Sequence, residues 1–323
     1  TKGTLTSTDL LPQQDVWVAV GANGDLRRHD VVKLSASTLQ RIGKGGEIEL
    51  LTANTRDFLY LFCKDGRCSR AAIHEIPYNG NNKHVAELTD FTRRDDITAA
   101  ISLPRIGPEA ATGFLFLVTE NGMVKRIPLA DFLSAAASDP RVINVDDKDR
   151  LRWVLPTAGE QEVILVSASG QAIRFSEEDV RSMGLAAGGV GGMKLKKGDR
   201  VVQALAVDPQ GELLTLTQFG FAKRTVLEQY SSQGRNGGGI VTHKPSERTG
   251  MVAAALLLNG DSPDAVVVVP SKGAVKIVEV ADVPQMGRGV QGKRVVDISN
   301  TKPVVAMWAV TEPAASTVTA DSE

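Results

Sequence analysis

The chain has 323 residues, of which 42% are hydrophobic, 23% charged and only 5% aromatic. These proportions are typical of a globular protein, and no apolar run approaches the roughly 20 residues that a membrane-spanning helix needs. The 37 Lys and Arg residues against 38 Asp and Glu give a formal net charge of −1, which argues against a uniformly basic nucleic-acid binder. A basic stripe on one rim, balanced by acidic residues elsewhere, is compatible with this charge because electrostatic attraction depends on the local field.

The start of the chain, Thr1–Thr4, is polar and lacks a Met, so we expect no signal peptide and a fragment of a longer protein. Cys63 and Cys68 flank one turn, and we expect free thiols in a reducing cytoplasm. The four histidines show no metal-ligand spacing, and no cofactor or metal site is predicted.

The dominant pattern is a sixfold repeat, in which an apolar run reaches a turn glycine about every 50 residues, a period typical of propellers and solenoids. The turn glycines are Gly24, Gly66, Gly122, Gly170, Gly220 and Gly273. The runs before them are Val16–Val20, Phe58–Phe62, Phe114–Val118, Val163–Val166, Leu213–Leu216 and Val266–Val269. Several runs are continuously apolar, which predicts strands covered on both faces, as in stacked blades.

Each unit closes on a second apolar stretch, which gives three or four strands per unit and an all-β fold. The stretches are Leu51, Ile97–Ile101, Leu151–Leu155, Val201–Val207, Met251–Leu258 and Val304–Val310. In the third unit, Ala130–Ala137 predicts a short helix. We expect a linker remnant at residues 1–14, the repeat domain at 15–310, and a disordered, mildly acidic tail at 311–323.

Basic residues follow the turn glycines at a fixed distance. Position +4 from the glycine holds Arg28, Arg70, Arg126, Arg174 and Arg224, whereas the sixth unit has Ile277 there and Lys276 at +3; further bases at +3 are Arg27, Lys125 and Lys223. Cations that protect an edge strand from aggregation are one interpretation, but it does not account for arginine at one offset in five of six units. The alternative is a ring of phosphate contacts.

A second glycine cluster follows most turns, at residues 43–46, 79–81, 188–192, 234–239 and 287–293, and carries Arg235, Arg288 and Lys293. Glycines allow a backbone to approach a phosphodiester closely, and the cations neutralise it. Gly188–Gly192 is not a dinucleotide-binding loop, because no helix pattern follows it. No catalytic constellation is present, so the fragment itself is predicted not to be an enzyme.

The heptad Gln40-Arg41-Ile42-Gly43-Lys44-Gly45-Gly46 resembles the gyrase A box, usually Gln-Arg-Arg-Gly-Gly-Lys-Gly, of the C-terminal domain of bacterial DNA gyrase A. Gln40, Arg41, Gly43 and Gly46 match directly. Ile42 stands where a second basic residue is usual, and Lys44 and Gly45 are exchanged relative to the box. Gly191–Val202 and Asp57–Arg67 also resemble pieces of gyrase blades, so the resemblance covers about residues 15–310.

This resemblance implies a six-bladed β-pinwheel, a propeller-like ring of four-stranded blades with strands exchanged between them. It implies a domain that wraps duplex DNA on its basic rim through the phosphate backbone, independently of sequence. The partners would be double-stranded DNA and the rest of gyrase A together with gyrase B in the full heterotetramer. That parent would be an ATP-dependent type II topoisomerase introducing negative supercoils in the bacterial cytoplasm, associated with the nucleoid.

Two alternatives remain. One is the comparable domain of topoisomerase IV, which is often smaller and lacks an intact box, so six units favour gyrase. The other is a propeller scaffold that binds proteins, which the near-neutral charge favours; however, Trp17, Trp153 and Trp308 occupy no regular blade position.

Overall fold

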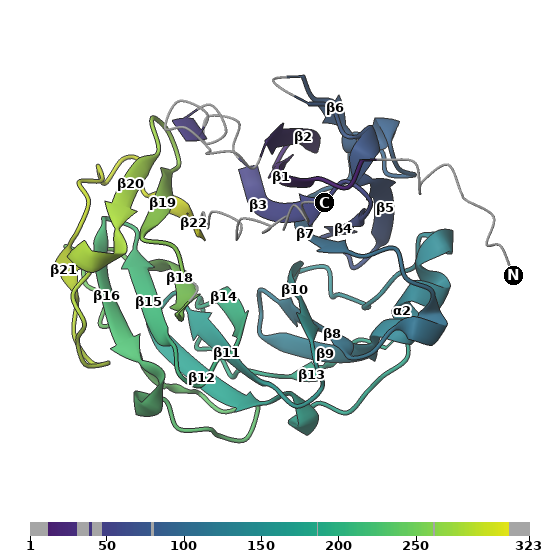
Figure 1. Cartoon of the computed structure of the whole chain (residues 1–323). Helices are drawn as coiled ribbons and strands as arrows, with labels where there is room; N and C mark the ends of the chain where they lie inside the picture. Colours follow the sequence, from purple (N-terminus) through teal and green to yellow (C-terminus); the bar gives the residue numbers. More distant parts are fainter. Residues whose placement is uncertain are drawn as a thin grey trace, which may run out of the picture.

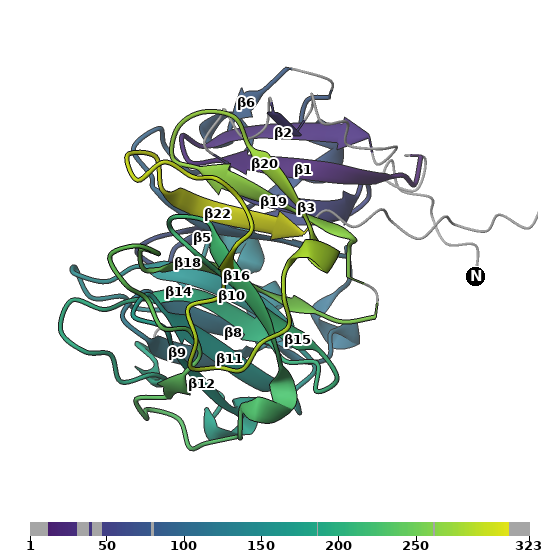
Figure 2. The same ribbon diagram turned by 90° about the vertical axis from the view of Figure 1, so that its left-hand side faces the viewer.

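The strands form six small antiparallel sheets arranged around a ring, seen along its axis in Figure 1 and from the side in Figure 2. The structure, a computed structural model, describes residues 12–30, 39–40, 47–78, 81–185, 187–260 and 262–309. The predicted all-β ring of six blades is confirmed. The expected N-terminal linker, apart from residues 12–14, and the expected tail lie outside the described residues.

The blades are numbered in chain order. Blade 1 contains β1 (Asp15–Gly21), β2 (Asp25–Asp30), β3 (Glu47–Asn54) and β6 (Lys83–His84), and blade 2 contains β4 (Phe58–Cys63), β5 (Cys68–Ala72) and β7 (Ile97–Leu103). Blade 3 contains β8 (Phe114–Thr119), β9 (Met123–Pro128), β10 (Leu151–Thr157) and β13 (Val190–Gly191). Blade 4 contains β11 (Glu162–Ser167), β12 (Gln171–Ser176), β14 (Val201–Ala206) and β17 (Ile240–Val241). Blade 5 contains β15 (Glu212–Thr217), β16 (Phe221–Val226), β18 (Val252–Leu258) and β21 (Lys293–Arg294), and blade 6 contains β19 (Ala265–Pro270), β20 (Lys276–Glu279) and β22 (Val304–Ala309).

Helical segments are short. The predicted helix of the third unit is confirmed as α2 (Leu129–Ala135), which is followed by the 3-10 turn η4 (Ala136–Ser138). The other 3-10 turns are η1 (Ile73–Glu75), η2 (Val85–Glu87), η3 (Pro108–Ala110), η5 (Glu177–Asp179), η6 (Leu227–Gln229) and η7 (Val280–Asp282). Within the described residues, no helix is long and apolar enough to cross a membrane.

Neighbouring units exchange their outermost strands. The outer strand of blade 3, β13, belongs to the fourth unit along the chain, and it pairs with β9 through Val190 and Gly191. In the same way β6, β17 and β21 complete blades 1, 4 and 5 from the following unit. The chain therefore crosses from one blade to the next at the outside of the ring, and the predicted glycine clusters at residues 188–192, 234–239 and 287–293 lie in these crossings.

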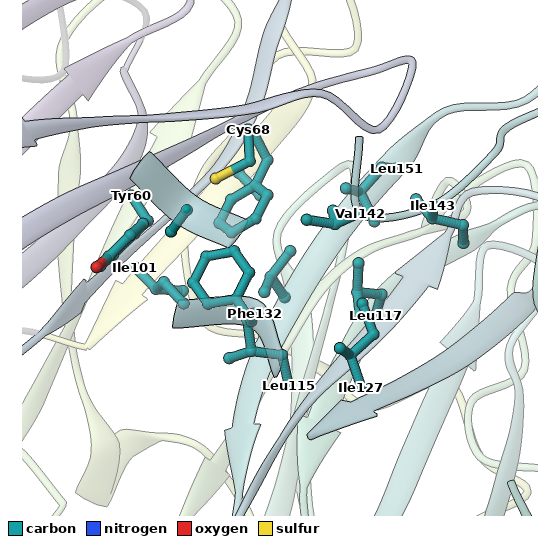
Figure 3. Packing of buried hydrophobic residues seen from close by; sticks show 14 of the residues in the cluster. Tyr60, Cys68, Ile101, Leu115, Leu117, Ile127, Phe132, Val142, Ile143 and Leu151 are labelled. Atoms are coloured by element: carbon teal, nitrogen blue, oxygen red, sulfur yellow. The ribbon is translucent and has the colours of Figure 1, made fainter. Parts of the chain in front are cut away.

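Hydrophobic packing occurs between blades. The cluster in Figure 3 joins blades 2 and 3: Tyr60 and Cys68 from one blade pack with Leu115 and Leu117 from the next, and Phe132 of α2 lies between them. The ring closes in the same way, because Trp17 of blade 1 packs in one cluster with Trp308 of blade 6. The strand formed by each apolar run is thus covered on both faces, which is why these runs are continuous.

The turn glycines lie on one face of the ring, which we call the turn face. Gly170 and Gly220 have φ of 82° and 84°, in the left-handed region that favours glycine. They also allow the next unit to pass closely, because a Cβ at either position would lie 2.1 Å from a carbonyl oxygen, of His243 and Val296 respectively. The glycine repeat therefore encodes both the hairpin turns and the strand exchange.

Candidate nucleic-acid interface

The five arginines at position +4 occupy equivalent places in their blades. Arg28, Arg126 and Arg174 each pair with the third residue of the apolar run before the turn, or with its equivalent, namely Val18, Phe116 and Ile164. Arg70 and Arg224 hold the same register. The fixed offset from the turn glycine therefore corresponds to one register position in five blades.

The side chains of three of these arginines, Arg28, Arg174 and Arg224, reach the next blade. Arg28 donates from Nε to the Ile76 carbonyl at 2.6 Å and from Nη2 to the His74 carbonyl at 3.1 Å. Arg174 donates from Nη1 to the Leu227 and Tyr230 carbonyls at 3.1 and 3.3 Å.

Arg224 donates from Nε to the Val283 carbonyl at 2.8 Å, and it pairs with Glu212 at 2.6 Å. The acceptors of Arg28, Arg174 and Arg224 are carbonyls in or just after η1, η6 and η7. These three arginines therefore act as clamps between adjacent blades.

Arg126 and Arg70 are held in related environments. Arg126 lies over Phe114 with 4.4 Å to the ring centroid, donates to the Gly159 carbonyl at 3.2 Å, and has only 12% of its side chain exposed. Arg70 lies over Phe58 at 4.5 Å. Arg126 and Arg70 thus both stack on a phenylalanine ring of their own blade. Contact of the five arginines with DNA phosphates stays a prediction.

Two lysines of the predicted set are fully buried. Lys125 donates from Nζ to three carbonyls, those of Val142, Leu185 and Ala187, at 2.6–2.9 Å. Lys223 donates to the Thr225 hydroxyl at 2.7 Å. Burial lowers the pKa of each lysine to about 8. The expectation that Lys125 and Lys223 contact DNA on an exposed rim is wrong, because both side chains are buried and their ammonium groups donate to oxygen atoms inside the protein.

The remaining predicted cations are accessible to different degrees. Lys276 and Lys293 are exposed. Arg235 and Arg288 are half-buried in the crossings, where Arg235 donates to the Gly191 carbonyl at 3.0 Å and Arg288 to the Val241 carbonyl at 3.2 Å. Arg27 is half-buried on β2.

Of the box-like heptad, only Gln40 is described. Its Nε2 donates to the Val275 carbonyl at 2.9 Å, which fixes the start of the heptad against blade 6. Arg41, Ile42, Gly43, Lys44, Gly45 and Gly46 lie outside the described residues.

Sequence reasoning missed a further set of exposed cations on the turn face. They lie in β21 and in the connections from outer strands to inner strands: Lys194, Lys196, Lys197, Arg200, Lys244, Arg248, Arg294 and Lys302. These connections are hydrogen-bonded to the hairpin turns. The Ser169 amide at one turn donates to the Asp199 carboxylate at 2.9 Å, and the Gln218 amide at the next turn donates to the Met251 carbonyl at 2.9 Å. Counting charges in the segments before each closing apolar stretch would have found them.

The centre of the ring holds a cavity of about 370 Å³, lined by the inner strands of all six blades. Glu49 and Arg152 face it, and burial raises the pKa of Glu49 to about 7 although the charge of Arg152 opposes this shift. Among the described residues, no group of three or more His, Cys, Asp or Glu is arranged to hold a metal ion.

Comparisons with solved structures give the class of protein. The C-terminal domain of DNA topoisomerase IV has a TM-score of 0.74 at 25% identity, covering 94% of this chain and 95% of that one. The DNA gyrase A C-terminal domain has a TM-score of 0.75 at 23% identity, covering 92% of this chain and 99% of that one. The ring with exchanged outer strands therefore has the fold of topoisomerase C-terminal domains.

The sequence comparisons go further. The family described as "DNA gyrase C-terminal domain, beta-propeller" matches residues 113–158, 161–208, 211–242 and 264–303. The DNA gyrase A protein of Escherichia coli (strain K12) is 30% identical over 318 residues, and that of Mycolicibacterium smegmatis (strain ATCC 700084 / mc(2)155) is 31% identical over 320. Both alignments cover 94% of this chain but only 36% and 37% of those proteins. The chain belongs to the DNA gyrase C-terminal domain family.

Proposed function

We propose that this chain binds duplex DNA through its phosphates and bends it around the ring, without itself cleaving DNA. Family membership supports this function. The particular residues that we assign to DNA binding are the exposed lysines and arginines of the turn face and its outer edge, the set listed above that begins with Lys194 and ends with Lys302. Phosphate contacts by lysines and arginines are independent of base sequence, so binding should be non-specific.

In this proposal the binding and structural residues are separate. The turn-face cations with Arg235, Lys276, Arg288 and Lys293 supply the phosphate contacts. The clamp arginines hold the blades in the geometry that presents them. Bending a short duplex by 40–90° costs on the order of 1–6 kcal/mol, which contacts distributed over several blades offset.

The wider context is also a proposal. The chain would serve as the wrapping domain of gyrase A, acting with the remainder of that protein and with gyrase B in a heterotetramer. The parent would be an ATP-dependent type II topoisomerase that introduces negative supercoils in the bacterial cytoplasm, at the nucleoid. The domain itself would need no cofactor.

A topoisomerase IV-type role is the second candidate, because the topoisomerase IV C-terminal domain superposes as well as the gyrase domain does. Fused to the remainder of either enzyme, a gyrase-type domain would support negative supercoiling of relaxed plasmid, whereas a topoisomerase IV-type domain would support relaxation and decatenation only.

Binding itself is tested by titrating a non-specific duplex at several salt concentrations. We expect the logarithm of the association constant to fall linearly with the logarithm of the salt concentration, by about 0.9 per phosphate contact. Neutralising Arg235, Arg288 and Lys293 to Gln should make this slope shallower. Binding that does not depend on salt, or no binding at all, would favour the protein-scaffold alternative.

A further inference from the structure

The charge of the turn face changes sharply from blade to blade. The connections of blades 2 and 3, residues 85–96 and 142–150, carry seven acidic and four basic residues. The segments serving blades 4 to 6, residues 192–200, 242–251 and 293–303, carry nine basic and three acidic residues. The near-neutral net charge therefore conceals an acidic sector, blades 2 and 3, and a basic sector, blades 4 to 6.

Several cations in the acidic sector form ion pairs with its carboxylates. Arg67 pairs with Asp65 and Asp95, and Arg150 lies 3.5 Å from Asp96. Burial alone would raise the pKa of Asp95, but hydrogen bonds from Thr92 and Arg67 lower it, so it is ionised at neutral pH. Further pairs are Lys64–Asp96 at 3.3 Å, Arg93–Glu87 at 3.2 Å and Arg150–Glu120 at 3.9 Å.

In the three basic segments, residues 192–200, 242–251 and 293–303, the lysines and arginines are exposed, and Arg294–Asp297 at 3.5 Å is the ion pair that these described segments show. Blade 5 also holds two guanidinium groups in place, because Arg248 and Arg294 each lie 5.1 Å from the centroid of the Phe221 ring. Stacking on one buried ring reduces the freedom of both side chains while leaving them accessible to a phosphate.

We propose that duplex DNA follows only part of the ring: it contacts the basic sector and leaves the protein where the acidic sector begins. This inference rests on the proposed function and adds the extent of the DNA path. Duplex DNA carries one negative charge per about 1.7 Å of axis, so ionised carboxylates within a Debye length of about 8 Å repel it at physiological salt. The acidic sector thereby sets where the contacts end.

Two triple variants with equal loss of charge test this path. One replaces Lys194, Lys196 and Lys197 with Gln, and the matched control replaces Arg93, Arg94 and Lys148 with Gln; all six side chains are exposed. We expect the first to lower the steepness of the salt dependence of duplex binding by as much as about 2.7, at about 0.9 per contact. The control should retain the wild-type slope, and both variants should keep the wild-type circular dichroism spectrum.

A gain-of-function variant completes the test. Asp146→Lys with Asp147→Lys removes two exposed carboxylates of blade 3, and we expect a longer hydroxyl-radical footprint on the duplex. Equal loss of slope in the two triple variants, or an unchanged footprint in the double variant, would overturn the partial path while leaving DNA binding intact. Failure of the wild-type chain to bind duplex DNA at all would instead overturn the proposed function.

Discussion

His243 shows how individual polar residues are accommodated in the interior of the ring. Its ring is fully buried between blades, with Nδ1 at 3.0 Å from the Thr215 hydroxyl and Nε2 at 2.8 Å from the Gln291 carbonyl. A neutral imidazole satisfies both contacts by donating from Nε2 and accepting at Nδ1. Burial, together with the charge of Lys223, lowers the pKa of His243 to about 4.

This shift predicts acid sensitivity. The pKa of an unfolded histidine is about 6.5, so as the pH falls the unfolded chain takes up the proton before the folded chain does. The contribution of His243 is therefore complete above pH 6.5 and is lost as the pH falls towards 4, at up to about 1.4 kcal/mol per pH unit. Urea unfolding at pH 7.5 and 5.0 should show a smaller loss of stability for His243→Gln than for wild type.

The control is His74→Gln, which removes a partly exposed histidine in blade 2. It should keep the wild-type difference in stability between the two pH values. If His243→Gln also kept that difference, the neutral buried imidazole would not be the source of acid sensitivity.

At the scale of elements, the clamp arginines join β-strands of one blade to 3-10 turns of the next. Arg174 on β12 connects to η6, and it also pairs with Glu162 on β11. Arg200→Met, at the exposed residue just before β14, offers a matched control in the same blade.

We expect Arg174→Met to lower the free energy of unfolding by about 2–3 kcal/mol, because it removes the hydrogen bonds to the Leu227 and Tyr230 carbonyls and the ion pair with Glu162. Arg200→Met should change stability by less than about 0.5 kcal/mol. Urea unfolding measures the stabilities, and salt-dependent duplex binding should show the reverse order, with the larger effect for Arg200→Met. A stable Arg174→Met protein with a shallower salt slope would return Arg174 to the DNA-binding set.

Much of the architecture is predictable from the sequence because short-range rules govern it. Continuous apolar runs and glycine turns such as Asn121-Gly122 specify the central hairpin of each blade, and the alanine-rich segment specifies α2. The burial of Arg126 and Lys125 could not be predicted this way. It depends on carbonyls more than 15 residues away along the chain, which only the packing of the folded blades brings close.

Short-range sequence rules also do not separate the exposed cations of the candidate site from the buried ones. A fixed offset from a turn glycine predicts that side chains hold the same register position in their blades, as Arg28 and Arg224 do. Such a repeated position can lie in the interior of the ring as well as on its surface. The irregularly spaced cations of residues 192–200 lack such a period, although they are the exposed ones.

At the scale of the whole molecule, six blades pack on their neighbours, and the closure between blades 6 and 1 through Trp308 and Trp17 makes the ring continuous. A continuous ring holds the basic sector as one rigid surface. We therefore expect a bound duplex to be curved, since contacts on several blades of a ring cannot be made to a straight rod.

The measurement that tests this most directly is a topology assay on plasmid DNA. A nicked plasmid is ligated in the presence of increasing amounts of the chain, the protein is removed, and the linking-number distribution is resolved on a gel. Wrapping around the ring predicts a shift of that distribution that grows with protein concentration and disappears at high salt. An unchanged distribution under conditions where the duplex is demonstrably bound would contradict wrapping, and would leave a domain that binds DNA without bending it.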